Sequence, residues 1–230
     1  ARERGYKTDF VDSRDFMRTD DRFTSAAPDM REIKKLARRK LKPAPGKIVV
    51  CQGFIGSTAD GVTTTLGRGG SDYSATIIGA ALGAETVEIW TDVSGILTTD
   101  PRLIPGARSI PKISYSEAAE LAYFGAKVVH PSSIQPAVEL GIPVYVKNTG
   151  DPDHAGTVIL PDADGRGLRA IAFKKNITLI NVVSSRMLNA YGFLSRIFAI
   201  FEKYRTPVDL VATSEVSVTV SVENTAHLKG

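Results

Sequence analysis

Cysteine is nearly absent from this 230-residue sequence, and long apolar runs are missing altogether. The single cysteine, Cys51, excludes a disulfide within the chain and a zinc site built from cysteines, and it favours a reducing compartment. No apolar run approaches the roughly 18 residues that a membrane span needs, and the first residues lack the apolar stretch of a signal peptide. We therefore expect a cytoplasmic protein without a membrane partner.

Positive charge is only slightly in excess of negative charge, with a formal net charge of +4. Much of the excess falls on one predicted helix, at Arg31, Lys34, Lys35, Arg38, Arg39, Lys40 and Lys42. No aromatic residues are interleaved with these positions and no nucleic-acid-binding module surrounds them. We interpret them as a solvated helix face and expect no nucleic-acid partner.

Two positions carry the signal of a helix start. Asp29 and Ser114 are each followed three residues later by Glu, which is the spacing of a capping box. Apolar residues at helical intervals follow Asp29, and a proline- and glycine-rich stretch comes after residue 41. The pattern predicts helices over 29–41 and from 114 to about 125.

The remaining pattern up to residue 146 alternates between strands and helices. The continuous apolar run at 48–51 is typical of a strand buried on both faces, and the Gly-, Thr- and Ser-rich residues 53–70 indicate a loop or hairpin. Further predicted elements are a helix over 71–82, a strand over 87–92, a helix over 131–141 and a strand over 143–146. The order predicts an α/β domain with a mainly parallel sheet and helices on both faces.

The pattern changes after a polar, glycine-rich stretch at 162–168, which we interpret as a linker between a first domain, 1–161, and a second, 169–230. The second domain has the predicted order strand, helix, strand, strand, the first half of a ferredoxin-like α+β unit. Its predicted strands are 177–183, 208–212 and 216–222, and its helix carries Leu194, Ile197, Phe198 and Phe201 on one face. Such a half-unit leaves its apolar faces partly uncovered, so we expect it to need a partner.

The strongest chemical signal is the glycine-rich segment 63–74 (TTTLGRGGSDYS). Its glycines allow a tight turn close to a ligand, and the helix that follows directs free N–H groups at that turn, which favours an anion. Arg68 has the guanidinium fork that grips a carboxylate or phosphate, and Asp72 has a carboxylate for an ammonium group. The alternative is an ordinary glycine-rich turn with Ser71 as the helix N-cap. The spacing is neither that of a P-loop nor that of a Rossmann motif.

A second segment, 90–102 (WTDVSGILTTDPR), leaves the carboxyl end of a predicted strand, where open α/β sheets bind ligands. Thr91 and Asp92 have hydrogen-bonding groups for a nucleotide, and Arg102 has the charge to reach its phosphates. The alternative is that the aspartates at 92 and 100 only build turns and caps.

A third segment, 124–131 (FGAKVVHP), places Lys127 after a glycine that ends a helix. This lysine has the charge to neutralise a phosphate, and the alternative is an ordinary surface lysine. His130 has no metal partner at ligand spacing, so we interpret it as structural and expect no metal site built by the protein.

These segments, together with 53–56 (GFIG) and 213–218 (TSEVSV), resemble the motifs of aspartate kinases, in the order of that family and over nearly the whole chain. The resemblance implies an amino-acid-kinase fold, of which this chain carries the C-terminal part, followed by a partial regulatory ACT domain. It also implies a nucleotide site formed by Thr91, Asp92, Arg102, Lys127 and Val128. Leu97 stands where relatives often have a tyrosine near the nucleotide.

The resemblance further implies that Arg68 binds the α-carboxylate of L-aspartate, and that Ser71 and Asp72 help to place the substrate and the catalytic centre. In the second domain it implies an effector site for an amino acid, with lysine favoured, at Met187, Gly192, Phe193, Leu194, Asp209, Ser214, Glu215 and Val216. The alternative interpretation of these eight residues is ACT-domain core and turns. Pairing of ACT domains implies a homodimer or a larger assembly.

The implied reaction transfers the γ-phosphoryl group of ATP, with Mg²⁺ on its phosphates, to the β-carboxylate of aspartate in the biosynthesis of lysine, threonine and methionine. The family's N-terminal Lys-Phe-Gly-Gly-type motif is absent and Ala1 stands first, so we expect a truncated chain with little activity by itself. Two alternatives remain: an amino-acid-binding regulatory module without catalysis, and part of a bifunctional aspartokinase–homoserine dehydrogenase.

Overall fold

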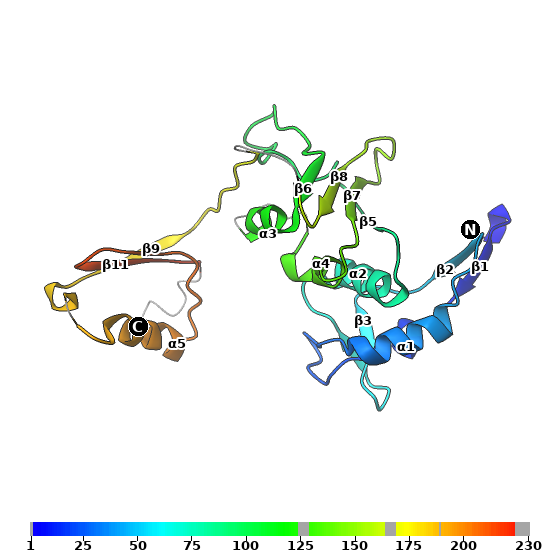
Figure 1. Ribbon diagram of the computed structural model, residues 1–230, viewed down its shortest axis with the longest axis horizontal. Helices are drawn as coiled ribbons and strands as arrows, with labels where there is room; N and C mark the ends of the chain where they lie inside the picture. The colour runs from blue at the N-terminus through cyan, green and yellow to red at the C-terminus, as the bar shows by residue number, and fades with distance from the viewer. Residues whose placement is uncertain (1, 124–128, 164–168, 189, 224–230) are drawn as a thin grey trace. The chain divides into compact units, whose positions relative to one another are not determined.

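The computed structural model describes residues 2–123, 129–163, 169–188 and 190–223 (Figure 1). The chain divides into two compact units, Ala1–Phe173 and Lys174–Gly230. The division falls after Phe173, rather than within the predicted linker 162–168. In the residues that the structure describes, no helix is both long and apolar enough to cross a bilayer.

The first unit begins with a small parallel sheet and a helix beside it. Its elements are the 3-10 helices η1 (Arg2–Arg4) and η2 (Ser13–Asp15), strands β1 (Lys7–Phe10) and β2 (Lys47–Val50), and helix α1 (Met30–Leu41). The predicted helix is confirmed, and the Asp29 side chain accepts hydrogen bonds from the N–H groups of Arg31 and Glu32. The second hydrogen bond of the predicted capping box, from the Asp29 N–H to the Glu32 side chain, is wrong, because the Asp29 N–H donates to the Arg18 carbonyl.

Strand β2 corrects a second prediction. Its apolar run is not buried on both faces, since Ile48 and Val50 are 40% and 45% exposed. Val49 and Cys51 pack against the core cluster around α1 instead. The difference arises because β1 and β2 form a sheet of two strands, of which the described helices cover one face.

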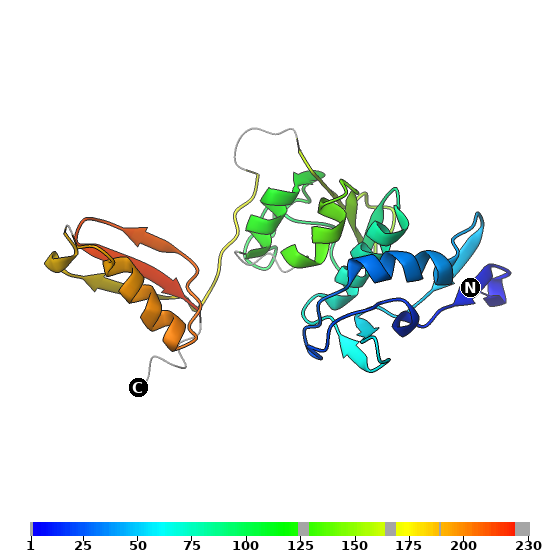
Figure 2. The same ribbon diagram turned by 60° about the horizontal axis from the view of Figure 1, so that its bottom comes forward.

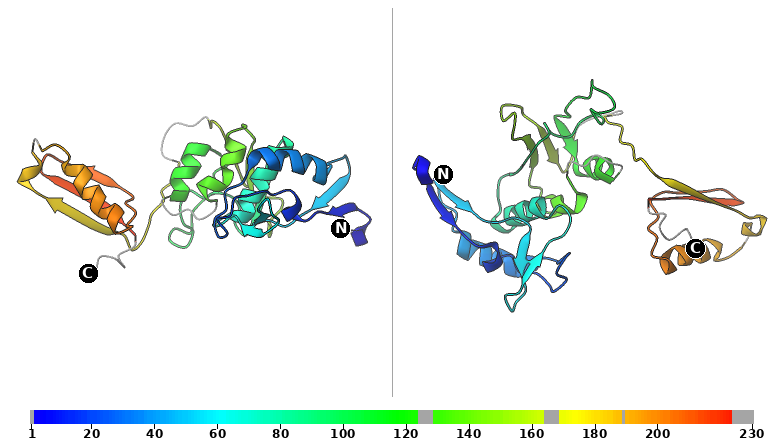
Figure 3. Two further views of the ribbon diagram at one scale, coloured as in Figure 1. Left: turned by 90° about the horizontal axis from the view of Figure 1, so that it is seen from below. Right: turned by 180° about the vertical axis from the view of Figure 1, so that it is seen from behind.

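A hairpin and a helix follow. Strands β3 (Ile55–Ser57) and β4 (Thr63–Thr65) pair antiparallel, which confirms the predicted hairpin, and helix α2 (Gly70–Leu82) comes next. Gly83 closes α2 in the left-handed conformation, with φ of 67°. Helix α2 packs between α1 and the later helix α4 (Pro131–Val138), and α3 (Tyr115–Tyr123) packs against α4 (Figure 3).

The main sheet of the first unit has the strand order β5-β7-β8-β6. These strands are β5 (Val87–Thr91), β6 (Lys112–Ser114), β7 (Val144–Asn148) and β8 (Thr157–Leu160). The β5–β7 and β6–β8 pairs are parallel and the β7–β8 pair is antiparallel. The expected α/β architecture with a mainly parallel sheet is therefore confirmed.

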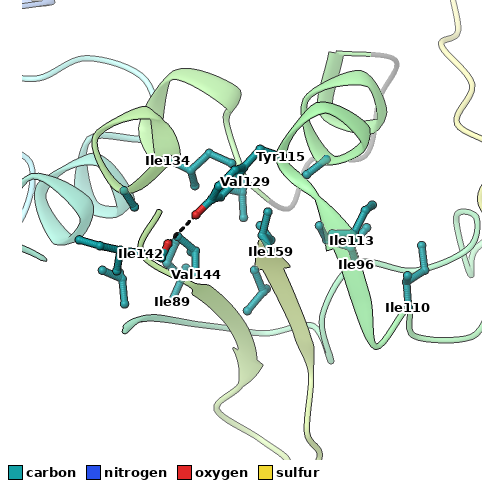
Figure 4. Close-up of a cluster of buried hydrophobic side chains, with 14 residues drawn as sticks. Ile89, Ile96, Ile110, Ile113, Tyr115, Val129, Ile134, Ile142, Val144 and Ile159 are labelled. Carbon is teal, nitrogen blue, oxygen red and sulfur yellow. Dashed lines mark hydrogen bonds between the residues drawn. The ribbon is translucent and has the colours of Figure 1, made fainter. Parts of the chain in front are cut away.

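The core of this unit lies between the sheet and helices α3 and α4 (Figure 4). The Tyr115 hydroxyl crosses it to donate a 2.5 Å hydrogen bond to the Ile142 carbonyl. The capping box predicted at Ser114 is confirmed, because Ser114 N–H donates to Glu117 Oε2 at 2.9 Å and Glu117 N–H donates to Ser114 Oγ at 3.2 Å. On the opposite face of the sheet Trp90 is 44% exposed, so α3 and α4 cover one side only, and the predicted helices on both faces are corrected to one face for the described residues.

The second unit has the predicted strand, helix, strand, strand order. Helix α5 lies across one face of a three-stranded antiparallel sheet of order β10-β11-β9, and Ile197, Val218 and Val220 form the buried centre between them (Figure 2). Its elements are β9 (Thr178–Val183), the 3-10 helix η3 (Ser185–Met187), α5 (Phe193–Lys203), β10 (Val211–Thr213) and β11 (Ser217–Val222).

Candidate active site

The first candidate site is the start of helix α2. Its N-cap residue is Gly69, with φ of 65° and no side-chain hydrogen bond, so the alternative with Ser71 as N-cap is wrong. The first N–H groups of a helix have no partner within the helix, and they carry the positive end of its dipole. The start of α2 is therefore able to attract an anion.

Close packing explains why this turn consists of glycine. A Cβ at position 70 would overlap the ring of Phe54, and a Cβ at position 69 would lie 2.5 Å from Ser133 Oγ. Phe54 has a φ of 72°, and its N–H donates to Ser74 Oγ at 2.8 Å. Sequence reasoning gave Phe54 and Ser133 no role, because their contacts with the turn join distant segments.

Arg68, Ser71 and Asp72 meet at this turn. Arg68 is exposed, and Ser71 Oγ donates to Asp72 Oδ1 at 3.4 Å. Burial raises the pKa of the half-buried Asp72 carboxyl, and the Ser71 hydroxyl opposes that rise. One cation, one carboxylate and the helix start thus come together, a set that is able to bind a carboxylate and an ammonium group side by side.

The second candidate site is a pocket of about 400 Å³ at the carboxyl end of β5. One part of its lining is polar: Thr91, Asp92, Thr99, Asp100 and Arg102. The other part is largely apolar: Val93, Gly95, Leu97, Pro101, Leu121, Ile171, Ala172 and Phe173. The predicted residues Thr91, Asp92 and Arg102 thus line one cavity, and Leu97 lines it as well.

Buried contacts hold the loop that forms the pocket. The Thr157 hydroxyl accepts from the Ile96 N–H at 2.8 Å and donates to the Ile110 carbonyl at 2.7 Å. Gly95 has a φ of 93°, and a Cβ there would overlap the same hydroxyl. Thr91 Oγ1 donates to Asp92 Oδ1 at 3.1 Å. The turn interpretation also applies at Asp100, whose Oδ1 accepts from the Arg102 N–H at 2.9 Å.

Sequence reasoning missed the far wall of this pocket. Ile171, Ala172 and Phe173 line it, although they fall in the predicted second domain. The Ile171 N–H donates to the Thr98 carbonyl at 2.9 Å, which fastens this segment to the loop. Upstream, Arg169 Nη1 donates to the Lys112 carbonyl at 2.9 Å. These contacts join residues 73 and 57 positions apart, and no local pattern signals them.

Lys127 and Val128, predicted to bind the nucleotide, lie outside the described residues. His130, which follows them, is the N-cap residue of α4, and its Nδ1 forms a 2.6 Å hydrogen bond with Ser132 Oγ. A Cβ at Gly69 would lie 3.2 Å from the Cβ of His130, so the starts of α2 and α4 are neighbours. The described part of the chain holds no cluster of three or more metal-ligating side chains.

The second unit separates the predicted effector residues. Met187 lies in η3, and Gly192, Phe193 and Leu194 form the start of α5. The Ser184 N–H donates to the Val216 carbonyl at 2.8 Å, which brings the turn with Ser214 and Glu215 to the same end of the sheet. Asp209 lies at the opposite end, where its N–H donates to the Ser221 carbonyl and Lys174 Nζ is 3.9 Å from its Oδ2. A single copy of the second unit therefore keeps the Asp209 and Glu215 side chains at opposite ends of the sheet.

Comparison with known proteins gives a consistent result. The profile of the amino acid kinase family matches residues 2–148. The chain is 46% identical over 226 residues to the lysine-sensitive aspartokinase 3 of Escherichia coli strain K12, and the alignment covers 97% of this chain and 50% of that protein.

Solved structures agree. The chain has a TM-score of 0.81 and 47% identity to E. coli aspartokinase III in complex with lysine and aspartate, over 96% of this chain and 50% of that one. The complex of E. coli aspartokinase III with aspartate and ADP gives a TM-score of 0.80 and 46% identity, over 97% and 50%. The chain thus spans about half the length of these relatives. Since the family profile covers more than half of the chain, the chain belongs to the amino acid kinase family.

Proposed function

We propose that this chain is the nucleotide-binding part of an aspartate kinase, which transfers the γ-phosphoryl group of ATP to the β-carboxylate of L-aspartate. The observation that carries the proposal is the pocket of about 400 Å³ after β5, where Thr91, Asp92 and Arg102 line one cavity. Its mixed lining suits a nucleotide, because the apolar wall accepts the base and the polar wall accepts the sugar and phosphates.

The start of α2 is the proposed aspartate site. Arg68 grips the α-carboxylate as a fork, and the half-buried Asp72 carboxylate holds the ammonium group or orients a neighbouring cation. The attacking β-carboxylate is already ionised, so the reaction needs no general base. These residues therefore act by placing the substrate and by balancing charge around the transferred group.

Mg²⁺, when bound to the ATP phosphates, neutralises charge that develops during transfer. The pocket lining fits such an ion, because Asp92 supplies carboxylate oxygens, the ligands that Mg²⁺ prefers. Lys127 is proposed to contribute a further positive charge. We place the kinase part at 1–161 and the protein in the cytoplasm.

The second unit, Lys174–Gly230, is the proposed regulatory part, a partial ACT domain that binds an amino-acid effector; the sequence predicts its start at 169. Lysine is the favoured effector, since the E. coli relative is named lysine-sensitive and its structure was solved with lysine. Asp209 and Glu215 lie at opposite ends of one copy, so a site that uses both needs a second copy. We therefore propose that the effector binds to a homodimer or a larger assembly.

The experiment uses both this chain and a protein that carries this sequence at the length of its relatives. We expect the chain to bind ATP but to turn over poorly, because it has no Lys-Phe-Gly-Gly-type motif. In the longer protein, formation of aspartyl phosphate is followed by hydroxylamine trapping. Arg68→Ala is expected to raise the KM for aspartate at least tenfold and to leave ATP affinity nearly unchanged.

Two results would count against this assignment. Loss of ATP affinity in Arg68→Ala with an unchanged KM for aspartate would move Arg68 to the phosphates. A longer protein that binds lysine but forms no aspartyl phosphate would favour the second candidate, a regulatory module without catalysis. The separate core of the second unit, around Ile197, is the observation that keeps this candidate open.

A further inference from the structure

Asp100 and Arg102 form an ion pair in the lining of the pocket. Arg102 Nε lies 3.0 Å from Asp100 Oδ1, and Arg102 Nη2 lies 2.7 Å from Asp100 Oδ2. The Asp100 side chain is 22% exposed and the Arg102 side chain is 85% exposed. The carboxylate thus occupies one edge of the guanidinium, with the cation at the rim of the cavity.

The geometry of this pair follows from the chain between the two residues. The pair Asp12–Arg14 has the same two-residue spacing and nearly the same distances, with Nε to Oδ1 at 3.0 Å and Nη2 to Oδ2 at 2.6 Å. Asp12 and Arg14 do not line the pocket. The Asp-x-Arg pair is therefore a local structure that forms without a ligand, and the copy at 100–102 differs by its place in the pocket wall.

A phosphate and a carboxylate bind to the same N–H groups of arginine. Each binds best to two adjacent N–H groups of the guanidinium, in a parallel, bidentate arrangement. The edge formed by Nε and Nη2 of Arg102 cannot bind the Asp100 carboxylate and a phosphate at the same time. A nucleotide phosphate that takes this edge therefore has to displace the Asp100 carboxylate.

We propose that Asp100 is a built-in competitor for Arg102: it holds the guanidinium edge when the pocket lacks nucleotide, and the phosphates displace it when nucleotide binds. The inference rests on the proposed nucleotide pocket and adds a residue to it. Asp100 acts through Arg102 as a positioning residue. It keeps the side chain at the pocket rim and weakens binding of phosphates, but it does not act on the base or the sugar.

The test measures binding of adenosine, ADP and ATP to the 230-residue chain by calorimetry, in EDTA so that Mg²⁺ does not mask the phosphates. Asp100→Asn keeps an oxygen that accepts the Arg102 N–H and removes the charge that competes. We expect it to tighten ATP binding about two- to fivefold, the range that an exposed ion pair sets. The gain should be smaller for ADP and absent for adenosine.

Two controls give the test its specificity. Asp12→Asn makes the same change in the matched pair outside the pocket and should leave all three affinities unchanged. Arg102→Gln should weaken ATP binding, and Asp100→Asn should give no gain in that background, because no guanidinium remains to be released. A gain that persists in the double variant would instead indicate simple charge repulsion and overturn the proposal.

The remaining outcomes are also decisive. Weaker ATP binding in Asp100→Asn, or an equal change for adenosine and ATP, overturns the competitor role while the nucleotide pocket stands. A wild-type chain that binds adenosine as tightly as ATP, or binds neither, removes the proposed pocket itself and the competitor with it.

Discussion

Replacing Gly70 by alanine tests why the start of α2 is built from glycine. The new Cβ would overlap Cδ2 of Phe54 and would lie 3.2 Å from its Cε2 and 3.4 Å from the Leu66 Cβ. Phe54 is 42% exposed, so its ring has some room to turn, but the bond from its backbone N–H to Ser74 Oγ at 2.8 Å holds its Cα beside Gly70. Overpacking of this kind costs about 1–3 kcal/mol. Alanine is better than glycine in a helix by about 0.5–1 kcal/mol, so the middle of the two ranges gives an expected net loss of about 1 kcal/mol.

The single tryptophan, Trp90, lies in the first unit, so its fluorescence reports the unfolding of that unit alone. A loss of this size lowers the melting temperature of such a unit by about 2–4 °C. Gly106→Ala is the matched control, since a Cβ there meets nothing within 4 Å and should not destabilise. A Gly70→Ala variant that melts with the wild type would refute the contact with Phe54 as the reason for glycine.

Two further predictions concern α3 and the pocket wall. Ser114→Ala removes the hydroxyl half of the capping box and should cost about 1 kcal/mol, more than Ser116→Ala, which removes only the 3.1 Å contact of Ser116 Oγ with Ser114 Oγ. Hydrogen bonds from Ser114, first its N–H and then its hydroxyl, lower the pKa of Glu117, so this stabilisation is present above the ordinary glutamate pKa of about 4.3 and is lost as the pH falls through the lowered value. The gap between the urea midpoints of variant and wild type should therefore narrow in acid without closing, because the Glu117 N–H still donates to Ser114 Oγ in the wild type. A gap that widens in acid would contradict this account. Arg169→Ala loosens the segment that ends at Phe173 and should weaken ATP binding several-fold in calorimetry, whereas Lys112→Ala keeps the carbonyl that Arg169 uses and should not; equal affinities in the two variants would contradict the anchoring role.

Features with a local cause were predictable from the sequence. The Ser114 capping box and the β-α-β-β order of the second unit depend on neighbours within a few positions, and both are confirmed. The prediction that β2 is buried on both faces was wrong. An apolar run indicates a strand, but it does not indicate how many of its faces other elements cover. The wall at 171–173 was missed for a related reason: its contact with Thr98 depends on the tertiary fold alone.

The directions of α2 and β5 bring the two candidate sites, the start of α2 and the pocket at the end of β5, to one edge of the sheet. Helix α2 has 13 residues and rises about 20 Å, and the five residues of β5 that follow return about 17 Å in the opposite direction. The start of α2 and the end of β5 therefore come to the same edge of the sheet. Helix α4 precedes β7, which is parallel to β5, so its start comes to that edge as well.

This convergence gives the proposed reaction a physical basis. Transfer of a phosphoryl group needs the acceptor and the leaving oxygen roughly in line, with positive charge around the group in transit. Arg68 and the N–H groups of α2 approach the edge from one segment, and Arg102 approaches it from the loop after β5. Each segment presents positive charge, and each is fixed by a hydrogen bond: the Phe54 N–H to Ser74 Oγ for the first, and the buried Ile96 N–H to Thr157 Oγ1 for the second. Two anions held at one edge by these elements would be close to the arrangement that the proposed reaction requires, once the phosphates have displaced Asp100 from Arg102.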